Sequence, residues 1–371
     1  MRVVLHRHGE RTHGASRTVR IAAGIALALS VITLSSSTVS ASALSIKVQG
    51  NHLVNQDGVT IRLLGVDRSG SEYECVTTNH VFDGPSNAAS VKAMVSWHIN
   101  AVRVPLNEDC WLGINGVVTG GVTYRNQIVR YVHTLESFGL YVILDLHWAA
   151  PGTDIAAGQS AMADADHSPT FWNSVAETFK SNHAVLFDLY NEPDGISWPC
   201  WLNGCQTTYG SPTVINYQTA GMQQLVDAVR STGATTPLML GGLWNADYVL
   251  GWRQYEPKDP DHQLVLSFHT YNDGGCDYPS CWSKEVAPLA KVVPVVTGEF
   301  GEDNCDDTYD LAFMAWADQH GVSYLGWTWD ATDAGWNCSS GPALIEDYGG
   351  KPTAYGVALK EHLARLAKLS G

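Results

Sequence analysis

The sequence is poor in basic residues: 22 Lys and Arg stand against 37 Asp and Glu, a formal net charge of −15. A surface this acidic repels nucleic acid and anionic lipid, because both are negatively charged. Beyond residue 43 the sequence also lacks an uncharged apolar run of about 18 residues, the length that a membrane-spanning helix needs. Nucleic-acid and membrane partners are therefore disfavoured, whereas neutral substrates, sugars among them, remain open.

The first 43 residues have the features of a secretory signal peptide. Residues 1–20 carry five arginines and one acidic residue, an apolar run extends from Ile21 to Leu34, and small residues lead to Ala43. A positive start, a short apolar core and small residues before the cleavage site are typical of such a leader. We expect cleavage near Ala43 and a secreted, monomeric mature protein of residues 44–371; an uncleaved membrane anchor is the alternative.

The sequence has no Cys-x-x-Cys pair, which argues against a zinc site, yet eight cysteines follow the leader. An even number of cysteines in an exported protein indicates disulfides, although eight can pair in many ways. Two pairs are close enough in sequence to close single loops, and the simplest remainder gives two long-range pairs. The four pairs are Cys200–Cys205, Cys276–Cys281, Cys75–Cys110 and Cys305–Cys338.

Short apolar runs alternate with helix-like segments along the mature chain, after a small hairpin formed by Ser45–Val48 and His52–Val54 with a turn at residues 56–58. The eight runs are Ile61–Val66, Ala101–Pro105, Tyr141–His147, Val185–Tyr190, Pro237–Gly241, Leu264–His269, Pro294–Glu299 and Tyr324–Trp329. The helix-like segments are Asn87–His98, Gln127–Phe138, Ser168–Ser181, Thr213–Ser231, Thr308–His320 and Thr353–Leu369.

Several of these runs are apolar without alternation, as expected of strands buried on both faces of a parallel sheet. Eight strands that alternate with helices predict a single (β/α)₈ TIM barrel over residues 44–371. A doubly wound open sheet is the alternative. Polar side chains recur at the carboxyl end of nearly every run, and we favour the barrel because barrel active sites form at that end.

Two glutamates stand at the ends of the fourth and seventh runs, Glu192 and Glu299. Strands four and seven lie on opposite sides of a barrel, so their terminal carboxyls can flank one sugar. Hydrolysis of a glycosidic bond needs two carboxyls with different tasks, one protonated to release the leaving oxygen and one ionised. The pair therefore predicts a glycosidase.

The motifs around these residues are specific in combination. Asn191-Glu192-Pro193 and Thr297-Gly298-Glu299-Phe300-Gly301 are joined by a His-x-Tyr at His269 and by the segment VRVPLN of the second run. Together they make residues 45–371 resemble glycoside hydrolase family 5, the cellulase family of the Asn-Glu-Pro clan. The resemblance implies a (β/α)₈ barrel that hydrolyses β-linked glycans with retention and without a metal or other cofactor.

The resemblance also implies a role for eight positions. The catalytic pair is Glu192 as general acid/base and Glu299 as nucleophile. The supporting roles are Arg103 for the nucleophile, Tyr271 as a donor to it, His147 in the subsite of the reacting sugar, Asn191 on its 2-hydroxyl, His269 beside the acid/base, and Trp329 as the platform beneath the sugar, with Trp327 as second candidate.

The exact glycan stays open. An endo-β-1,4-glucanase is the first expectation, a β-mannanase or an exo-acting, disaccharide-releasing enzyme is the alternative, and a non-catalytic glycan-binding barrel is the remote one. Asp67 follows the first run, where the family often has Asn. The loops that carry Glu72, Glu108 and Trp111, and later Trp198 and Trp201, are expected to shape the cleft.

Overall fold

A computed structural model describes residues 43–209, 214–331 and 342–370, all within one compact unit that begins at Ser42. The predicted leader falls almost entirely outside these residues, so its cleavage stays a prediction. Among the helices described, none is long and apolar enough to cross a membrane.

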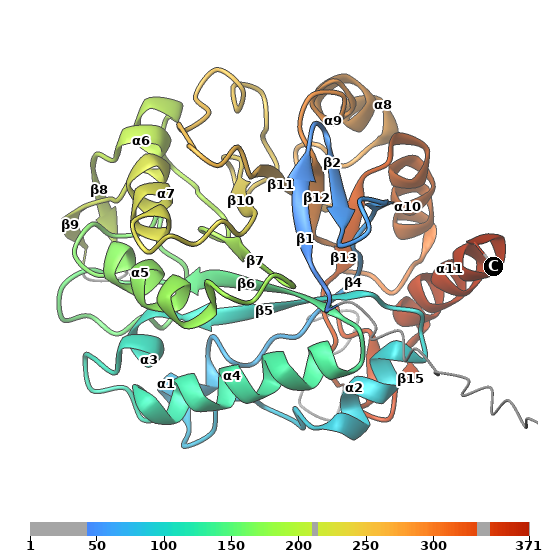
Figure 1. The fold of residues 1–371 in the computed structure, drawn as a ribbon, viewed down its shortest axis with the longest axis horizontal. Helices are drawn as coiled ribbons and strands as arrows, with labels where there is room; N and C mark the ends of the chain where they lie inside the picture. The colour runs from blue at the N-terminus through green and yellow to red at the C-terminus, as the bar shows by residue number, and fades with distance from the viewer. Residues whose placement is uncertain (1–42, 210–213, 332–341, 371) are drawn as a thin grey trace, which may run out of the picture. The chain divides into compact units, whose positions relative to one another are not determined.

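Eight parallel strands close into a barrel, in the order β10-β11-β12-β13-β4-β5-β6-β7 (Figure 1). The strands are β4 (Leu64–Asp67), β5 (Ala101–Asn107), β6 (Tyr141–Trp148), β7 (Val185–Asp188), β10 (Leu238–Gly241), β11 (Leu264–Tyr271), β12 (Val295–Gly301) and β13 (Ser323–Gly326). Each overlaps one of the eight predicted apolar runs, with bounds that differ at the ends. The predicted barrel is confirmed, and closure between β13 and β4 rules out the open doubly wound sheet.

Helices surround the strands, as Figure 1 shows. They are α1 (Glu74–Thr77), α2 (Ala88–Val95), α3 (Glu108–Leu112), α4 (Val122–Ser137), α5 (Ser168–Phe179), α6 (Trp198–Asn203), α7 (Met222–Arg230), α8 (Pro279–Cys281), the π-helix η1 (Trp282–Val286), α9 (Ala287–Ala290), α10 (Thr308–His320) and α11 (Ala354–Ser370). In α5 the residues at helical spacing, Phe171, Trp172, Val175 and Phe179, are buried. This apolar stripe holds the helix against the barrel wall.

A three-stranded antiparallel sheet packs at the amino ends of the barrel strands: β1 (Ile46–Gln49), β2 (His52–Asn55) and β3 (Thr60–Ile61). The predicted hairpin is present, but the turn at residues 56–58 leads to a third strand that takes Ile61 out of the first barrel run. Ile46 and Leu53 join barrel residues such as Ile143 and Met239 in one buried cluster. The sheet therefore closes the end of the barrel opposite the predicted site.

The predicted helix at Thr213–Ser231 is partly wrong. Ile215–Gln218 forms strand β9, which pairs with β8 (Gln206–Tyr209), and helix α7 begins only at Met222. Tyr217 is buried, and its hydroxyl donates to the Met162 carbonyl at 2.8 Å. This long-range contact overrides the local helical spacing. A last short pair, β14 (Ile345–Asp347) and β15 (Lys351–Pro352), precedes α11.

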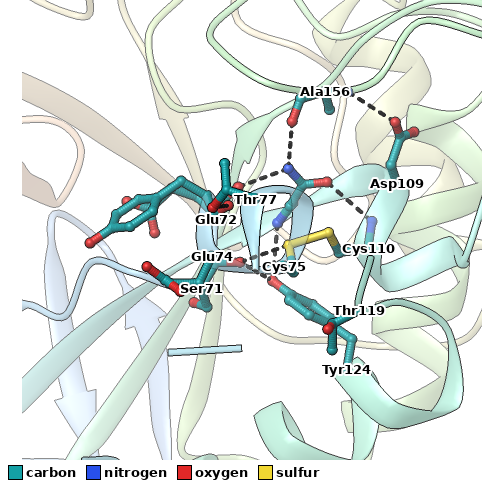
Figure 2. The surroundings of a disulfide bond; sticks show 12 residues. Ser71, Glu72, Glu74, Cys75, Thr77, Asp109, Cys110, Thr119, Tyr124 and Ala156 are labelled. Carbon is teal, nitrogen blue, oxygen red and sulfur yellow. Dashed lines mark hydrogen bonds between the residues drawn. A yellow bond between two sulfur atoms is a disulfide. The ribbon is translucent and has the colours of Figure 1, made fainter. Parts of the chain in front are cut away.

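Three of the four predicted disulfides are present: Cys75–Cys110, Cys200–Cys205 and Cys276–Cys281. Cys305 is also disulfide-bonded, but Cys338 lies outside the described residues, so that pairing stays a prediction. Figure 2 shows Cys75–Cys110, which joins α1 in the loop after β4 to α3 after β5. Nearby, the Tyr124 hydroxyl donates to the Ser71 carbonyl at 2.9 Å. These bonds fix two loops at the carboxyl end of the barrel.

Candidate active site

Contacts at the carboxyl end of the barrel connect seven of the eight predicted site residues. Arg103 lies at the centre of this cluster, on β5, and its side chain is fully buried. Its guanidinium donates to the Glu299 carboxylate at 2.7 Å and to the Asn191 side-chain oxygen at 2.8 Å. One cation thus links the predicted nucleophile on β12 to the Asn-Glu-Pro loop after β7.

Three further carboxylates contact the same guanidinium. Asp67 and Asp188 end β4 and β7, and Asp145 lies within β6. They are 3.0, 3.0 and 3.1 Å from Arg103 nitrogens, and all three are fully buried. Burial raises the pKa of Asp145 and of Asp188 to about 7, although Arg103 opposes the shift. Burial therefore favours the protonated form of these two aspartates more than water does.

The Glu299 carboxylate is held at both oxygens. Arg103 donates to Oε1, and the Tyr271 hydroxyl donates to Oε2 at 2.6 Å. The Glu299 side chain is 4% exposed, and burial keeps the pKa of Tyr271 well above 10, so the tyrosine stays a donor. Two donors, one of them a cation, are suited to holding an ionised carboxylate in a buried setting.

Glu192 has a different environment. Its side chain is 17% exposed, its Oε1 lies 3.0 Å from His269 Nδ1, and its Oε2 lies 3.4 Å from Asn245 Nδ2. Burial raises the pKa of its carboxyl, although His147, Arg103 and the hydrogen bond from Asn245 oppose the shift. One oxygen of Glu192 and one of Glu299 lie within 4.8 Å of each other. The two carboxyls are close together but differently supported.

Both histidines of the cluster are neutral at ordinary pH. Burial lowers the pKa of His147 to about 4 and that of His269 to about 3. His147 Nδ1 lies 2.7 Å from Asp145, and the His269 ring packs against Gly298, where a Cβ would come within 2.8 Å of Nε2. Because residue 298 is glycine, the His269 ring has room to lie beside Glu192.

Trp329 is the predicted residue that the structure does not bring to the cluster. It is fully buried and packs edge-on against Trp97 beneath α2, with ring centroids 4.8 Å apart. Trp327 is partly exposed and stacks on His147, at 5.4 Å and an interplanar angle of 9°. The choice between the two tryptophans is thereby corrected. Strand β13 ends at Gly326, so strand alternation no longer governs which of them faces the barrel mouth.

Several side chains on the loops that are expected to shape the cleft are buried. Glu72 and Glu108 are buried, Glu72 accepting from the Gly70 amide and Glu108 from the Ser168 hydroxyl. Trp111 and Trp201 are fully buried as well. These side chains hold the loops rather than face solvent.

Three residues in contact with the cluster, Asp188, Gln159 and Asn245, are absent from the predicted set because their sequence signals are weaker. A single Asp inside the apolar run Val185–Tyr190 must be paired when buried, which could have marked Asp188 as a partner of an internal arginine. Gln159 donates to the Glu192 carbonyl and accepts from Asn191. It lies in a long loop after β6, and no local pattern relates it to the fourth strand.

Two groups of described residues offer ligand atoms that a metal ion could bridge: Glu192 with His269 and Glu299, and Glu108 with Asp164 and His167. In a third group, Cys276 and Cys281 form a disulfide and cannot act as thiolates. In the first group, Arg103 and Tyr271 already occupy the Glu299 oxygens. The donor set there suits proton transfer and charge stabilisation on a substrate.

A closed (β/α)₈ barrel with two unlike carboxyls facing each other at its carboxyl end defines the class of barrel glycosidases. A family model described as Cellulase (glycosyl hydrolase family 5) matches residues 66–333, more than half of the chain. The chain belongs to this family.

Curated relatives are similar at low identity. Endoglucanase CelA of Streptomyces lividans is 22% identical over 307 residues, 78% of this chain and 56% of that protein. A mannan endo-1,4-beta-mannosidase of the same organism is 23% identical over 280 residues, 73% of this chain and 65% of that protein. The chain spans only 52% to 60% of the length of three endoglucanases that it matches.

Solved structures share the fold. The beta-glucanase SdGluc5_26A from Saccharophagus degradans superposes with a TM-score of 0.67 at 18% identity, over 87% of this chain and 94% of that one. An endocellulase from Pyrococcus horikoshii gives a TM-score of 0.66 at 19% identity, over 87% and 98%. At these identities the likeness supports the barrel and not a particular substrate.

Proposed function

We propose that the protein is a retaining glycosidase that works by double displacement. The observation that carries the proposal is the approach of Glu192 and Glu299 to within 4.8 Å between carboxylate oxygens. Retaining enzymes hold their carboxyls about 5–5.5 Å apart, whereas inverting enzymes leave roughly 6.5–9.5 Å for a water molecule. A separation this short favours direct attack by a carboxylate over attack by a water held between the two carboxyls.

The unlike surroundings of the two carboxyls assign their tasks. Glu299, held by Arg103 and Tyr271, is the nucleophile that attacks the anomeric carbon. Glu192, with its pKa raised by burial, gives its proton to the leaving oxygen. In the second half-reaction Glu192 takes a proton from water, and that water releases the sugar from Glu299.

The neighbours complete the subsite for the reacting sugar. Hydrogen bonds to Arg103 and Gln159 fix the Asn191 side chain. In this fixed position Asn191 can contact a hydroxyl of the sugar. Trp327 stacks on His147 with one face, and its other face can carry a pyranose ring. We assign Trp327, in place of Trp329, as the platform.

The substrate that we propose is a β-1,4-glucan cleaved internally. Its support is the name of the relatives, several of which are endoglucanases, and a solved neighbour described in complex with cellotetraose. Release of reducing sugar from carboxymethylcellulose tests this proposal. No release from this polymer or from mixed β-glucans by the pure protein contradicts it.

The mechanism has its own test, independent of the polymer. Proton NMR of the first product of an activated β-cellobioside should show the β-anomer before mutarotation, and an α-anomer first would refute retention. Glu299→Ala should lose turnover, and azide should restore it with the inverted product. The matched variant Glu302→Ala lies on the same segment and should not show azide rescue.

A second candidate is a β-mannanase, which the mannan endo-1,4-beta-mannosidase relative favours. The catalytic pair would be the same, and only contacts to the sugar 2-hydroxyl would differ. The ratio of kcat/KM on cellopentaose to that on mannopentaose separates the two. We also propose export after cleavage near Ala43 and a monomeric state, which amino-terminal sequencing of secreted protein and gel filtration test.

A further inference from the structure

Glu108, Asp164 and His167 bring three metal-ligating side chains together where α3, α5 and the long loop after β6 meet. Glu108 lies in the first turn of α3, and Asp164 and His167 stand at the end of the loop, just before α5 begins at Ser168. One ligand atom from each of the three side chains lies within 4.8 Å of the other two. Acidic groups often gather without an ion, so proximity alone does not define a site.

The carboxylates of Glu108 and Asp164 are fully buried but have too few hydrogen-bond donors. Asp164 Oδ1 accepts from the His167 backbone amide at 2.7 Å. The Ser168 hydroxyl lies within hydrogen-bond distance of both Glu108 Oε2 and Asp164 Oδ2, yet its single proton can satisfy only one of them. Glu108 Oε1 has no partner, so two of the four carboxylate oxygens lack a donor. Buried charges are normally paired or coordinate a metal ion.

The imidazole of His167 also has an unused ligand atom. Its Nδ1 is buried, forms no hydrogen bond, and lies 3.9 Å from both Asp164 Oδ1 and Asp166 Oδ2. This spacing is too long for a hydrogen bond. It is only slightly longer than the separation of two atoms that share one ion, each about 2.0–2.2 Å from it. In the part of the chain that the structure describes, neither Glu108 nor Asp164 forms an ion pair with lysine or arginine.

An ion can reach this cluster from solvent. A surface pocket of about 580 Å³ is lined by Ala165 and Asp166, the two residues between Asp164 and His167, and by Tyr217 of β9. The side chain of Asp166 is 50% exposed and that of His167 is 24% exposed. The half-exposed carboxylate next to His167 therefore attracts cations toward the buried oxygens behind it.

We propose that Glu108, Asp164 and His167 bind one divalent transition-metal ion, and that Zn²⁺ is the ion that this donor set suits. Zinc accepts imidazole and carboxylate ligands together, whereas Ca²⁺ and Mg²⁺ prefer oxygen ligands alone. Asp166 can supply a fourth ligand from the side of the pocket, since its carboxylate lies 3.9 Å from His167 Nδ1. A proton shared between Glu108 and Asp164 is the competing arrangement.

The role of this ion is structural. It ties the first turn of α3 to the end of the loop after β6, and that loop carries Gln159, which contacts the Glu192 carbonyl and the Asn191 side chain. Among the described residues, the hydrogen-bond partners of the two catalytic glutamates include none of the three ligands. The ion therefore holds the loop and does not contact the reacting atoms.

Zinc binding to the purified protein, stripped of metal with EDTA and then freed of EDTA, tests the site. Titration calorimetry with ZnCl₂ should show an ion held by these residues, and the denaturation midpoint should rise with Zn²⁺ concentration. His167→Gln removes a partly exposed ligand, and Asp164→Asn keeps the shape of the side chain; each should weaken zinc binding at least roughly 10-fold. His133→Gln is the matched control and should bind zinc like the wild type, because His133 lies at the surface of α4 beside Glu136.

Wild-type zinc affinity in His167→Gln or in Asp164→Asn overturns the proposal, because the ion then binds elsewhere, for example at the catalytic pair. The absence of zinc binding to the folded wild type also overturns it and leaves the shared proton. Limited proteolysis adds a second readout: Zn²⁺ should slow cleavage within residues 149–167 of the wild type but not of His167→Gln. Equal slowing in both contradicts the site. None of these measurements uses hydrolysis, so a failure of the proposed function remains distinguishable.

Discussion

Arg103 and Glu299 are joined by a 2.7 Å hydrogen bond across the barrel interior, from β5 to β12. The same guanidinium contacts three aspartates and Asn191, so the side chain that fixes the predicted nucleophile also fixes the barrel wall. Arg103 therefore both stabilises the barrel and positions the predicted nucleophile.

Replacement of Arg103 by Lys is expected to lower kcat by about 100-fold or more, since an ammonium cannot reproduce the fork of donors and Glu299 shifts. The loss should appear in steady-state kinetics on an activated cellobioside. Arg230 is a matched control. It pairs with Asp259 at a distance of 2.7 Å, and this pair lies outside the cluster. Arg230→Lys should reduce the denaturation midpoint but leave kcat near that of the wild type. Equal kcat losses in both variants would contradict a specific role for Arg103.

Removal of the Tyr271 hydroxyl takes one donor from Glu299. A hydrogen bond to a charged group contributes about 1.5–3 kcal/mol, so Tyr271→Phe should reduce kcat/KM roughly 10- to 100-fold. Tyr309→Phe serves as control, since its hydroxyl contacts Thr270, the neighbouring residue on β11, at 2.6 Å. Activity in Tyr271→Phe that matches this control would show that the contact to Glu299 is dispensable.

The two tryptophans near the end of β13 should respond oppositely. Trp329→Ala leaves a cavity beside Trp97 and is expected to destabilise the fold by about 3–5 kcal/mol. Trp327→Ala should keep the stability of the wild type and raise KM for oligosaccharides by roughly 3- to 10-fold. Urea denaturation and kinetics on the same samples measure both effects. A large rise in KM in a folded Trp329 variant, with none in the Trp327 variant, would show that Trp329 is the sugar platform.

The contact between Asn245 and Glu192 sets part of the pH dependence. The amide lowers the pKa of Glu192 against the raising effect of burial, so Asn245→Ala should raise that pKa slightly and Asn245→Asp, by like-charge repulsion, should raise it further. Because Glu192 acts protonated, the alkaline limb of kcat/KM should move up by roughly half a unit to one unit in Asn245→Asp. A downward shift would exclude Glu192 as the acid.

Glu108 should affect stability and not catalysis. Burial and nearby Asp164 raise its pKa well above 4.5, so the folded protein keeps a proton that the unfolded chain releases. Its contribution is fully present below the unfolded pKa and is lost as pH rises through the folded pKa. In that window each unit of pH costs about 1.4 kcal/mol of unfolding free energy for one proton.

Glu108→Gln mimics the protonated side chain, and its unfolding free energy should fall less with rising pH than that of the wild type. Denaturation midpoints across a pH series measure the two slopes. The exposed Glu177→Gln, which pairs with Lys180 at the surface, is the control and should not change the slope. Identical slopes for Glu108→Gln and the wild type would show that Glu108 is ionised in the folded state.

Local patterns in the sequence were enough to predict much of this protein. The eight apolar runs became the eight barrel strands, because a strand buried on both faces needs uninterrupted apolar residues. Glu192, Glu299 and their motifs could be found because barrel chemistry gathers at strand ends. The two local disulfides followed from short separations along the chain.

Tertiary structure decided what depends on contacts between distant segments. Asp188 became a partner of Arg103 only in the folded barrel, where β6 lies between their strands, and Asn245 became a partner of Glu192 only where β10 pairs with β7. Trp327 and Trp329 are two residues apart beyond the end of β13, where no periodicity fixes their directions, and packing against Trp97 chose which one is buried. The sequence by itself determined the strands and the catalytic pair, because those depend on local periodicity; the partners of each side chain depend on packing, which only the folded barrel supplies.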